Sequence, residues 1–180
     1  MIIVVVGMPG SGKDVFVRAA MDVGFSKVSM GDVVRHFASL SGLGSDDASI
    51  GGFAGSQRRE HGPAIWAQRT LDIMPDGNVI IDGSRSLDEM ALFRERLGGN
   101  LKVVAIAAPP EKRFERLQSR RRQDDPADRE NFNRRDEREL SWGLGRAIGT
   151  AEITLVNDGT LEDFQASCRN VLRDVLARGD

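Results

Sequence analysis

Cysteine is almost absent from this chain, since Cys168 is the one cysteine among 180 residues. A single thiol excludes an intrachain disulfide framework and a zinc site built from several cysteines. The sequence also lacks an apolar run of the roughly 18 residues needed for a membrane-spanning helix, and its start lacks the charged, apolar and cleavage segments of a signal peptide. We therefore expect a cytoplasmic protein without a membrane partner, in which Cys168 is a small, buried apolar residue.

Lysine is scarce as well, although basic residues are not. The 25 basic residues include only the lysines Lys13, Lys27, Lys102 and Lys112, and the rest are arginines. Guanidinium groups suit bidentate phosphate recognition, but genomic base composition explains the same bias equally well. The net charge of −2 lacks the basic excess typical of nucleic-acid-binding proteins, so we expect no nucleic-acid partner.

The strongest motif lies at the amino terminus. An apolar run at 2–6 leads into Gly-Met-Pro-Gly-Ser-Gly-Lys at 7–13, and a helical pattern follows. Glycines let successive backbone N–H groups point at phosphate oxygens. Lys13 adds a positive charge, and the following helix directs the positive end of its dipole to the same place. The motif predicts a phosphate-binding loop formed by Gly7, Met8, Pro9, Gly10, Ser11, Gly12 and Lys13.

One position departs from the usual form of this loop. A serine or threonine normally follows the lysine and gives its hydroxyl to Mg²⁺, but here the residue is Asp14. A carboxylate also binds Mg²⁺, although it brings negative charge close to the phosphates. The apolar run at 78–82 ends in a second carboxylate, Asp82, and an acid in that place commonly holds the metal or its water. We therefore expect Asp14 and Asp82 to bind the metal.

Apolar runs alternate with amphipathic stretches along the chain. We expect strands at 2–6, 27–29, 78–82, 102–107 and 152–156. We expect helices between them, among others at 64–74, at 128–140 and from a capping box at Thr160 to about Gly179. This order predicts one three-layer α/β/α domain over 1–180, with a five-stranded, mostly parallel sheet and the ligand at the carboxyl ends of the strands.

One segment should lie over the sheet. It is a helical insertion at 31–72, in which a helix restarts with Asp46 or Asp47 as its N-cap.

Four separated segments together resemble the nucleoside monophosphate kinases, and adenylate kinase in particular. Besides the phosphate loop, Ser-Met-Gly-Asp-Val-Val-Arg at 29–35 is similar to the start of that family's monophosphate-binding lid, and Asp-Gly-Ser-Arg at 82–85 looks like its Asp-Gly-Phe-Pro-Arg. The resemblance implies a P-loop NTPase fold in which Arg35 and Arg85 hold the phosphate of the acceptor.

Three further residues are candidates for the acceptor site. Asp32 lies in the segment that resembles the monophosphate lid, and Arg58 lies on the next helix, where solvation of that helix is an equally good interpretation. Four residues after Arg85 the family has a glutamine that reads adenine, whereas this chain has Glu89. A carboxylate only accepts hydrogen bonds, so Glu89 suits the two adjacent donors of guanine at least as well.

The fourth segment resembles the arginine run that leads into the family's second lid, which implies a short lid region at 116–138. By this match Arg116 stacks on the adenine of ATP, Arg120 contacts its phosphates, and Arg122 and Arg135, the latter preferred over Arg134, close on the transferred phosphoryl group. The many acidic neighbours allow another interpretation, a salt-bridged helix face. The segment 156–162 looks like a turn of dephospho-CoA kinases, which implies that Asn157 lies beside the nucleotide base.

The resemblance implies a phosphotransferase that moves the γ-phosphoryl group of ATP or another Mg-bound nucleoside triphosphate to a nucleoside monophosphate or a similar acceptor. A phosphate acceptor attacks as an anion and needs no base, so the chemistry requires positioning and electrostatics rather than a catalytic histidine. One alternative is a dephospho-CoA kinase, whose hydroxyl acceptor needs a base such as Asp32. Another is a nucleotide-binding sensor or slow NTPase, which Asp14 and the short lid favour. We expect a monomer or homodimer whose partners are small-molecule nucleotides.

Overall fold

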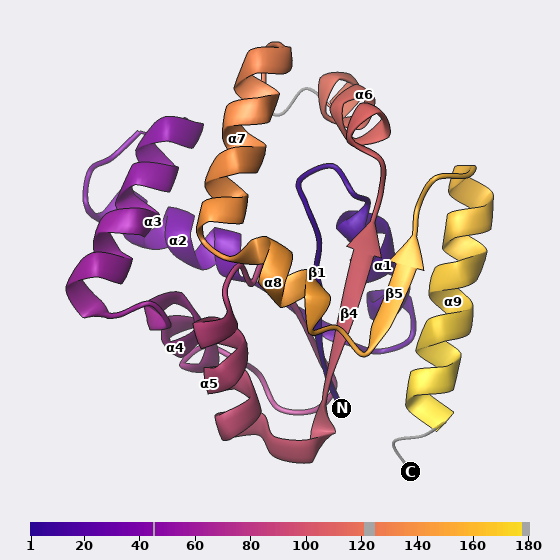
Figure 1. The fold of residues 1–180 in the computed structure, drawn as a ribbon. Coiled ribbons are helices and arrows are strands. Elements are labelled where there is room, and N and C mark those ends of the chain that lie inside the picture. The colour runs from indigo at the N-terminus through magenta and orange to yellow at the C-terminus, as the bar shows by residue number, and fades with distance from the viewer. Residues whose placement is uncertain (45, 121–124, 178–180) are drawn as a thin grey trace.

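The structure is a computed structural model that describes residues 1–44, 46–120 and 125–177. In this part of the chain, five strands form one sheet in the order β2-β3-β1-β4-β5 (Figure 1). Their bounds are β1 (Ile2–Val6), β2 (Ser26–Ser29), β3 (Val79–Asp82), β4 (Leu101–Ala107) and β5 (Ile153–Val156). All four pairings are parallel. The predicted five-stranded, mostly parallel sheet is confirmed.

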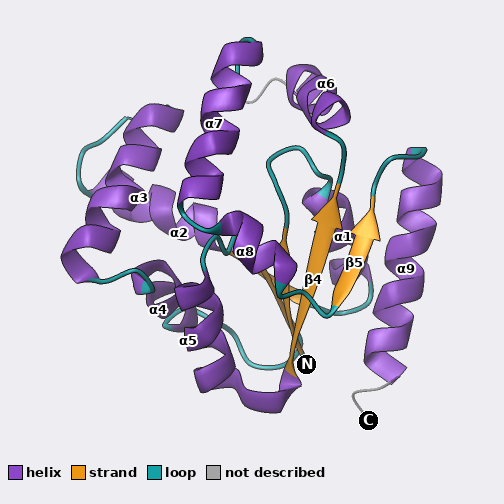
Figure 2. Cartoon of the chain, viewed as in Figure 1, coloured by secondary structure: helices purple, strands orange, loops and turns teal. Residues whose placement is uncertain are grey.

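Helices cover both faces of the sheet (Figure 2). Over the described residues they are α1 (Lys13–Asp22), α2 (Met30–Leu40), α3 (Asp47–His61), α4 (Ile65–Leu71), α5 (Leu87–Leu97), η1 (Gly98–Asn100), α6 (Pro110–Arg120), α7 (Arg129–Ser141), α8 (Leu144–Gly149) and α9 (Leu161–Ala177). Among these helices, none combines the length and the apolar character that crossing a membrane requires.

The central strand β1 connects the two halves of the core. Ile3 and Val5 belong to an apolar cluster with side chains of α1 and α9, whereas Val4 and Val6 belong to the opposite cluster with side chains of α2, α4 and α5. All four side chains are fully buried, and burial of each such side chain contributes about 1.5–3 kcal/mol. The strand therefore fixes the start of the loop at 7–13, which curves at the upper end of β1, below α6 and to the right of α7 in the view of Figures 1 and 2.

The segment that the sequence assigns to a helical insertion forms α2, α3 and α4. Asp46, one of the two predicted N-caps, accepts a hydrogen bond from the Ser49 backbone N–H at 2.9 Å and begins α3. The fully buried Trp66 of α4 donates its indole N–H to the Ala54 carbonyl of α3 at 3.1 Å. This bond and the surrounding apolar side chains hold the two helices together. The assignment of an acceptor-binding role to this segment stays a prediction.

Three details differ from the sequence-based expectation. The sequence pattern does not predict helix α8, because six residues are too short to show a helical period. The helix expected at 64–74 ends at Leu71, and Met74 precedes Pro75, which disfavours helical backbone in the residue before it. Leu40 fits the apolar pattern of its helix but is 70% exposed, because it is the last residue of α2 and an exposed turn follows it.

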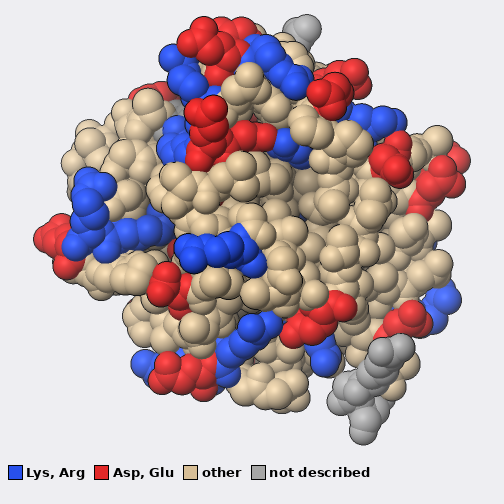
Figure 3. All heavy atoms as spheres, viewed as in Figure 1, with Lys and Arg blue, Asp and Glu red and all other residues tan. Residues whose placement is uncertain are grey.

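Charged side chains of both signs are interspersed on the face that Figure 3 shows. The absence of a nucleic-acid partner stays a prediction.

Candidate functional site

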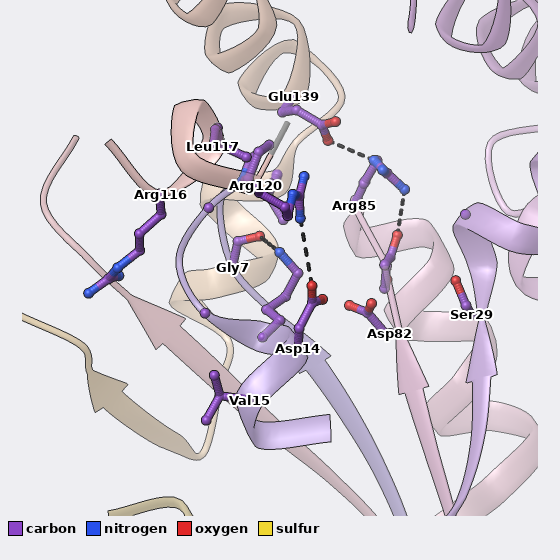
Figure 4. A pocket seen from close by; sticks show the side chains of 18 of the residues that line it. Gly7, Asp14, Val15, Ser29, Asp82, Arg85, Arg116, Leu117, Arg120 and Glu139 are labelled. Atoms are coloured by element: carbon purple, nitrogen blue, oxygen red, sulfur yellow. Dashed lines mark hydrogen bonds and ion pairs between the residues drawn. The ribbon is translucent and has the colours of Figure 1, made fainter. Parts of the chain in front are cut away.

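A cavity of about 340 Å³ lies at the carboxyl ends of β1, β2 and β3. Its walls come from the loop at 7–13, the segment after β3, and helices α2, α6 and α7 (Figure 4). Of the predicted site residues, it is lined by Gly7, Pro9, Gly10, Gly12, Lys13, Asp14, Arg35, Asp82, Arg85, Arg116, Arg120 and Arg135. The structure therefore brings most of the predicted donor and acceptor residues to one place, whereas Met8, Ser11, Asp32, Arg58, Glu89 and Asn157 do not line this cavity.

The loop at 7–13 needs glycine where its backbone turns. Gly10 and Gly12 have φ values of 78° and 103°. A Cβ on Gly10 would lie 2.6 Å from the Arg113 carbonyl oxygen, and a Cβ on Gly12 would lie 2.3 Å from the Asn157 amide nitrogen. Helix α1 begins directly after Gly12 and no side chain caps it. The positive end of the helix dipole therefore faces the cavity, where an anion would be stabilised.

Lys13 holds its ammonium group against the backbone of this loop. Its Nζ donates to the Gly7 carbonyl at 2.7 Å and to the Met8 carbonyl at 3.3 Å. Burial lowers the pKa of Lys13, although the nearby carboxylate of Asp82 opposes the shift. An arriving phosphate would supply the counter-charge that the buried ammonium needs.

Asp14 and Asp82 lie near each other in the cavity (Figure 4). Asp82 Oδ1 is buried and has no hydrogen-bond partner among the described residues, while Asp14 Oδ2 lies 3.6 Å from Arg120 Nη1. No group of three or more histidine, cysteine or carboxylate side chains that could hold a metal occurs in the described chain. The pair of carboxylates fits Mg²⁺, which usually takes one or two carboxylates and completes its shell with waters and substrate phosphates.

Arg85 is fixed by a carboxylate that the sequence pattern does not single out. Its Nε donates to Glu139 Oε2 at 2.6 Å and its Nη1 donates to the Gly83 carbonyl at 2.8 Å (Figure 4). Burial, the largest single cause, would lower the pKa of Arg85, but the charge and hydrogen bond of Glu139, with the charges of Glu89 and Asp82, together raise it. Burial alone would likewise raise the pKa of Glu139, but Arg85 lowers it. Both groups are therefore charged at neutral pH.

The two lid arginines that the structure describes meet at one carboxylate. Arg120 donates to Asp125 from Nε at 3.1 Å and from Nη2 at 2.6 Å. Arg135 Nη1 lies 3.9 Å from the same carboxylate. The ion pair joins the end of α6 to α7. Arg122, the third predicted lid arginine, lies outside the described residues.

The predicted base contacts form a chain of hydrogen bonds on the other side of the loop. Arg116 Nη2 donates to the backbone carbonyl and to Oδ1 of Asn157, each at 3.1 Å. The Asn157 amide in turn donates to the Ser11 carbonyl at 2.8 Å. In Figure 4, Arg116 and Arg85 lie on opposite sides of the view, with Asp14 and Arg120 between them. This separation is what a donor end and an acceptor end of one site require.

A second cavity of about 60 Å³ adjoins the first and is lined by Arg58, among other residues. Glu89 does not line it, because Glu89 is fully buried and accepts hydrogen bonds from Arg58 at 3.0 Å and from the Arg85 backbone N–H at 2.6 Å. Glu89 also closes a capping box with Ser86 at the start of α5. A role of Glu89 in reading a base stays a prediction that these contacts do not support.

Arg113 is a second residue that sequence reasoning missed. It is only 4% exposed, and its Nη1 donates to the Pro9 carbonyl at 3.1 Å and to Asp136 Oδ1 at 2.9 Å. Arg113 thereby connects α6, the phosphate loop and α7. Arg113 precedes the apolar Leu117 by four residues, so both lie on the same face of α6. This spacing is the signal in the sequence that could have indicated the burial of Arg113.

Comparisons with known proteins agree with this architecture. Residues 6–133 match the model of the AAA domain family. A UPF0200 protein of Thermoplasma acidophilum is 46% identical over 173 residues, covering 96% of this chain and 95% of that protein. A UPF0200 protein of Hyperthermus butylicus is 41% identical over 182 residues, covering 99% of this chain and 97% of that protein.

Solved structures share the fold at low identity. Shikimate kinase from Acinetobacter baumannii, in complex with shikimate, has a TM-score of 0.65 at 17% identity, and a gluconokinase from Sinorhizobium meliloti has 0.61 at 17%. In both cases the match covers 98% of this chain and 93% of the other. The chain therefore has the α/β fold of the P-loop kinases, as its resemblance to the nucleoside monophosphate kinases implied.

Proposed function

The chain belongs to the UPF0200 family, and we propose that it is a P-loop phosphotransferase. In this proposal it moves the γ-phosphoryl group of ATP, or of another nucleoside triphosphate, to a phosphate-bearing acceptor. The observation that carries the proposal is the pair of adjoining cavities, which share Arg35, Arg85, Arg135 and Glu139 as lining residues. A donor held by the glycine loop and an acceptor held beyond the shared arginines would place their phosphates between the two cavities. The solved neighbours are named as kinases, which supports the reaction class.

The donor end suits a triphosphate. The glycine loop and the start of α1 would hold the phosphates, with Lys13 at the end where transfer occurs. Asp14 and Asp82 would hold Mg²⁺, which would supply positive charge to neutralise the phosphates of the bound triphosphate. Arg120 and Arg135 would stabilise the charge that spreads over the transferred group, after Arg120 releases Asp125. Each of these two arginines would contribute on the order of 10³-fold to the rate if it acts as an arginine finger.

The acceptor end suits a phosphate better than a hydroxyl. A hydroxyl acceptor, as in a dephospho-CoA kinase, needs a general base, and Asp32 is the candidate. Partial burial raises the pKa of Asp32, but the hydrogen bond and charge of Arg35 outweigh it and lower this pKa. A carboxylate held below its ordinary pKa is a weak base at neutral pH, whereas a phosphate acceptor attacks as an anion and needs no base.

The test is acceptor-dependent turnover. The protein is supplied with Mg-ATP and a panel of nucleoside monophosphates, small phosphorylated acids and dephospho-CoA, and release of ADP is followed together with phosphorylated product. We expect faster ADP release with a phosphate-bearing acceptor than with water alone and no product from dephospho-CoA. Rates no higher than with water alone would refute the proposal and favour the sensor or slow NTPase.

Two variants test the division into donor and acceptor ends. Lys13→Ala should abolish triphosphate binding or turnover, whereas Arg85→Ala should raise the KM for the acceptor with nearly unchanged affinity for the donor. Lys112→Ala and Arg96→Ala remove exposed basic side chains from α6 and α5 and serve as matched controls. Equal losses of donor affinity in Lys13→Ala and Arg85→Ala would contradict the division. A cytoplasmic location and a monomeric or homodimeric state stay predictions.

A further inference from the structure

The smaller cavity has walls that suit an anion. The side chains of Arg35, Arg58, Arg85, Arg135 and Arg138 all line it, and among its described lining residues Glu139 is the one carboxylate. The other walls are the Trp142 indole and small or apolar residues such as Gly51 and Ile50. No asparagine, glutamine, serine or threonine side chain occurs among these described lining residues, so the polar groups that usually read a nucleobase are absent from this wall.

Arg58 lines this space and carries donors that lack partners. Its Nη2 donates to the buried Glu89 carboxylate at 3.0 Å. Its Nε and Nη1 are buried and have no hydrogen-bond partner in the described part of the chain. Buried donors are nearly always paired, and an anionic ligand beside Arg58 would supply an acceptor that the described residues do not.

Positive charge converges on one aromatic ring in the wall. The guanidinium carbons of Arg58, Arg138 and Arg85 lie 5.0, 5.5 and 5.9 Å from the centroid of Trp142. Like charges held this close repel each other in a partly buried site. Glu89 and Glu139 offset part of the repulsion through Arg58 and Arg85, and an anionic ligand beside these arginines would offset more of it.

The size of the cavity restricts the ligand group. A volume of about 60 Å³ holds about two waters, at their liquid volume of about 30 Å³ each. A carboxylate or a phosphate fits this space, whereas a purine ring system is larger. Glu89, the residue expected to read a base, is fully buried behind Arg58 and Ser84.

We propose that the smaller cavity is a binding subsite for a second anionic group of the acceptor. The substrate class is then a small molecule with a phosphate at one end and a carboxylate or a second phosphate at the other, rather than a nucleoside monophosphate. The inference rests on the proposed function, because Arg35 and Arg85 line both cavities and would hold the first phosphate of the acceptor between them.

Gly51 offers a probe of this subsite that removes none of its arginines. It lies inside α3, where glycine is less stable than alanine, and a Cβ there would lie 3.3 Å from the Arg138 guanidinium carbon. The neighbouring Gly52 is exposed, and a Cβ on Gly52 would have no atom within 4 Å. A side chain at Gly51 would therefore intrude on the cavity, whereas the same side chain at Gly52 would reach solvent.

The experiment is calorimetric titration of the full chain, with Mg²⁺ and a non-hydrolysable ATP analogue present. Two probes are 3-phosphonopropionate and propane-1,3-bisphosphonate, called dianions because each carries two anionic groups. Propylphosphonate is the matched probe that lacks the second anionic group, and AMP is the nucleoside monophosphate. The proteins are wild type, Arg58→Gln, Gly51→Leu and Gly52→Leu. Glutamine keeps a donor for Glu89, and Gly51→Leu provides a second route if Arg58→Gln fails to fold.

We expect at least one of the two dianions to bind wild type about 10- to 100-fold more tightly than propylphosphonate, the range that a charge-assisted hydrogen bond provides. This preference over propylphosphonate should be lost in Arg58→Gln and Gly51→Leu and should persist in Gly52→Leu. The carboxylate and bisphosphonate arms show which second anion is preferred. Tighter binding of AMP than of both dianions, a ratio near one in wild type, or no binding of any probe would overturn the inference.

Turnover separates this inference from the proposed function. If the dianions bind as expected but no acceptor is phosphorylated, the phosphotransferase proposal fails and the subsite stands. If AMP is phosphorylated equally well by wild type and Arg58→Gln, the phosphotransferase proposal stands and the subsite fails.

Discussion

Replacement of Glu139 by glutamine tests the charge balance at the centre of the site. Glu139 is 3% exposed, its Oε2 lies 2.6 Å from Arg85 Nε, and its charge also acts on Lys13. Glutamine keeps the shape of the side chain but removes the charge, so Arg85 loses its closest counter-charge. We expect Glu139→Gln to be less stable than wild type when no ligand is bound.

The magnitude follows from the burial of the pair. Removing one partner of a buried ion pair costs about 3–5 kcal/mol. The Arg85 side chain keeps 26% of its surface exposed, so water can compensate part of the loss and we expect about 3 kcal/mol. For a chain of this size, 1 kcal/mol corresponds to about 2–4 °C in Tm, which predicts a decrease of about 6–12 °C.

The loss should depend on pH in a defined direction. Burial, the largest single cause, would raise the pKa of Glu139, but the charge and hydrogen bond of Arg85, with the charges of Arg135 and Lys13, together lower it below the ordinary value of 4.5. A carboxylate whose folded-state pKa is lowered stabilises the fold above its unfolded-state pKa, and this stabilisation is lost as pH falls through the folded-state value. The difference in the free energy of unfolding between wild type and Glu139→Gln should be constant from about pH 8 to about pH 5 and should become smaller below that range.

The assay is urea unfolding followed by circular dichroism at several pH values, with Glu137→Gln as the control. Glu137 is an exposed residue of the same helix, α7, and its replacement should change the free energy of unfolding by no more than about 0.5 kcal/mol. Pyrophosphate should restore part of the stability of Glu139→Gln, because a bound anion replaces the missing charge. Equal stability of wild type and Glu139→Gln, or a difference that widens as the pH falls, would refute the reasoning.

Two further predictions concern residues away from the reacting groups. Burial raises the pKa of Cys168 from 9.0 to about 11, so its thiolate fraction at neutral pH is about 100-fold lower. Iodoacetamide should therefore modify the native protein at least about 100-fold more slowly than the urea-unfolded protein, and rates within tenfold of each other would contradict this. The lysine of Arg113→Lys cannot keep both the Asp136 and the Pro9 contacts of the guanidinium. The free energy of unfolding in urea should therefore decrease by about 1.5–3 kcal/mol. Arg173→Lys, an exposed exchange on α9, should leave the free energy of unfolding almost unchanged.

The parts of the site that the sequence could indicate are those whose chemistry is local. The loop at 7–13 needs its glycines because of its own backbone conformation, so the spacing alone predicts it. Asp82 and Arg85 follow directly from the position where an apolar strand ends, since the carboxyl ends of parallel strands meet at one edge of a sheet. Asp46 at the start of α3 is indicated in the same way by a local N-cap preference.

The residues that sequence reasoning missed depend on partners far away in the chain. In the sequence, Glu139 cannot be distinguished from the exposed acidic residues around it. Only the packing of α7 against the segment after β3 makes it the partner of Arg85, 54 residues away. The resemblance to adenylate kinase implies that Glu89, four residues after Arg85, faces a ligand, yet the capping of α5 and the ion pair with Arg58 use its oxygens. A carboxylate beside arginines in a sequence can be a surface charge, an internal counter-charge or a ligand contact, and these have the same local pattern. Which of these roles a carboxylate has depends on its burial and on the residues that other elements bring into contact with it. For this chain, the role of Glu89 also decides whether the acceptor end of the site recognises a base or a second anion.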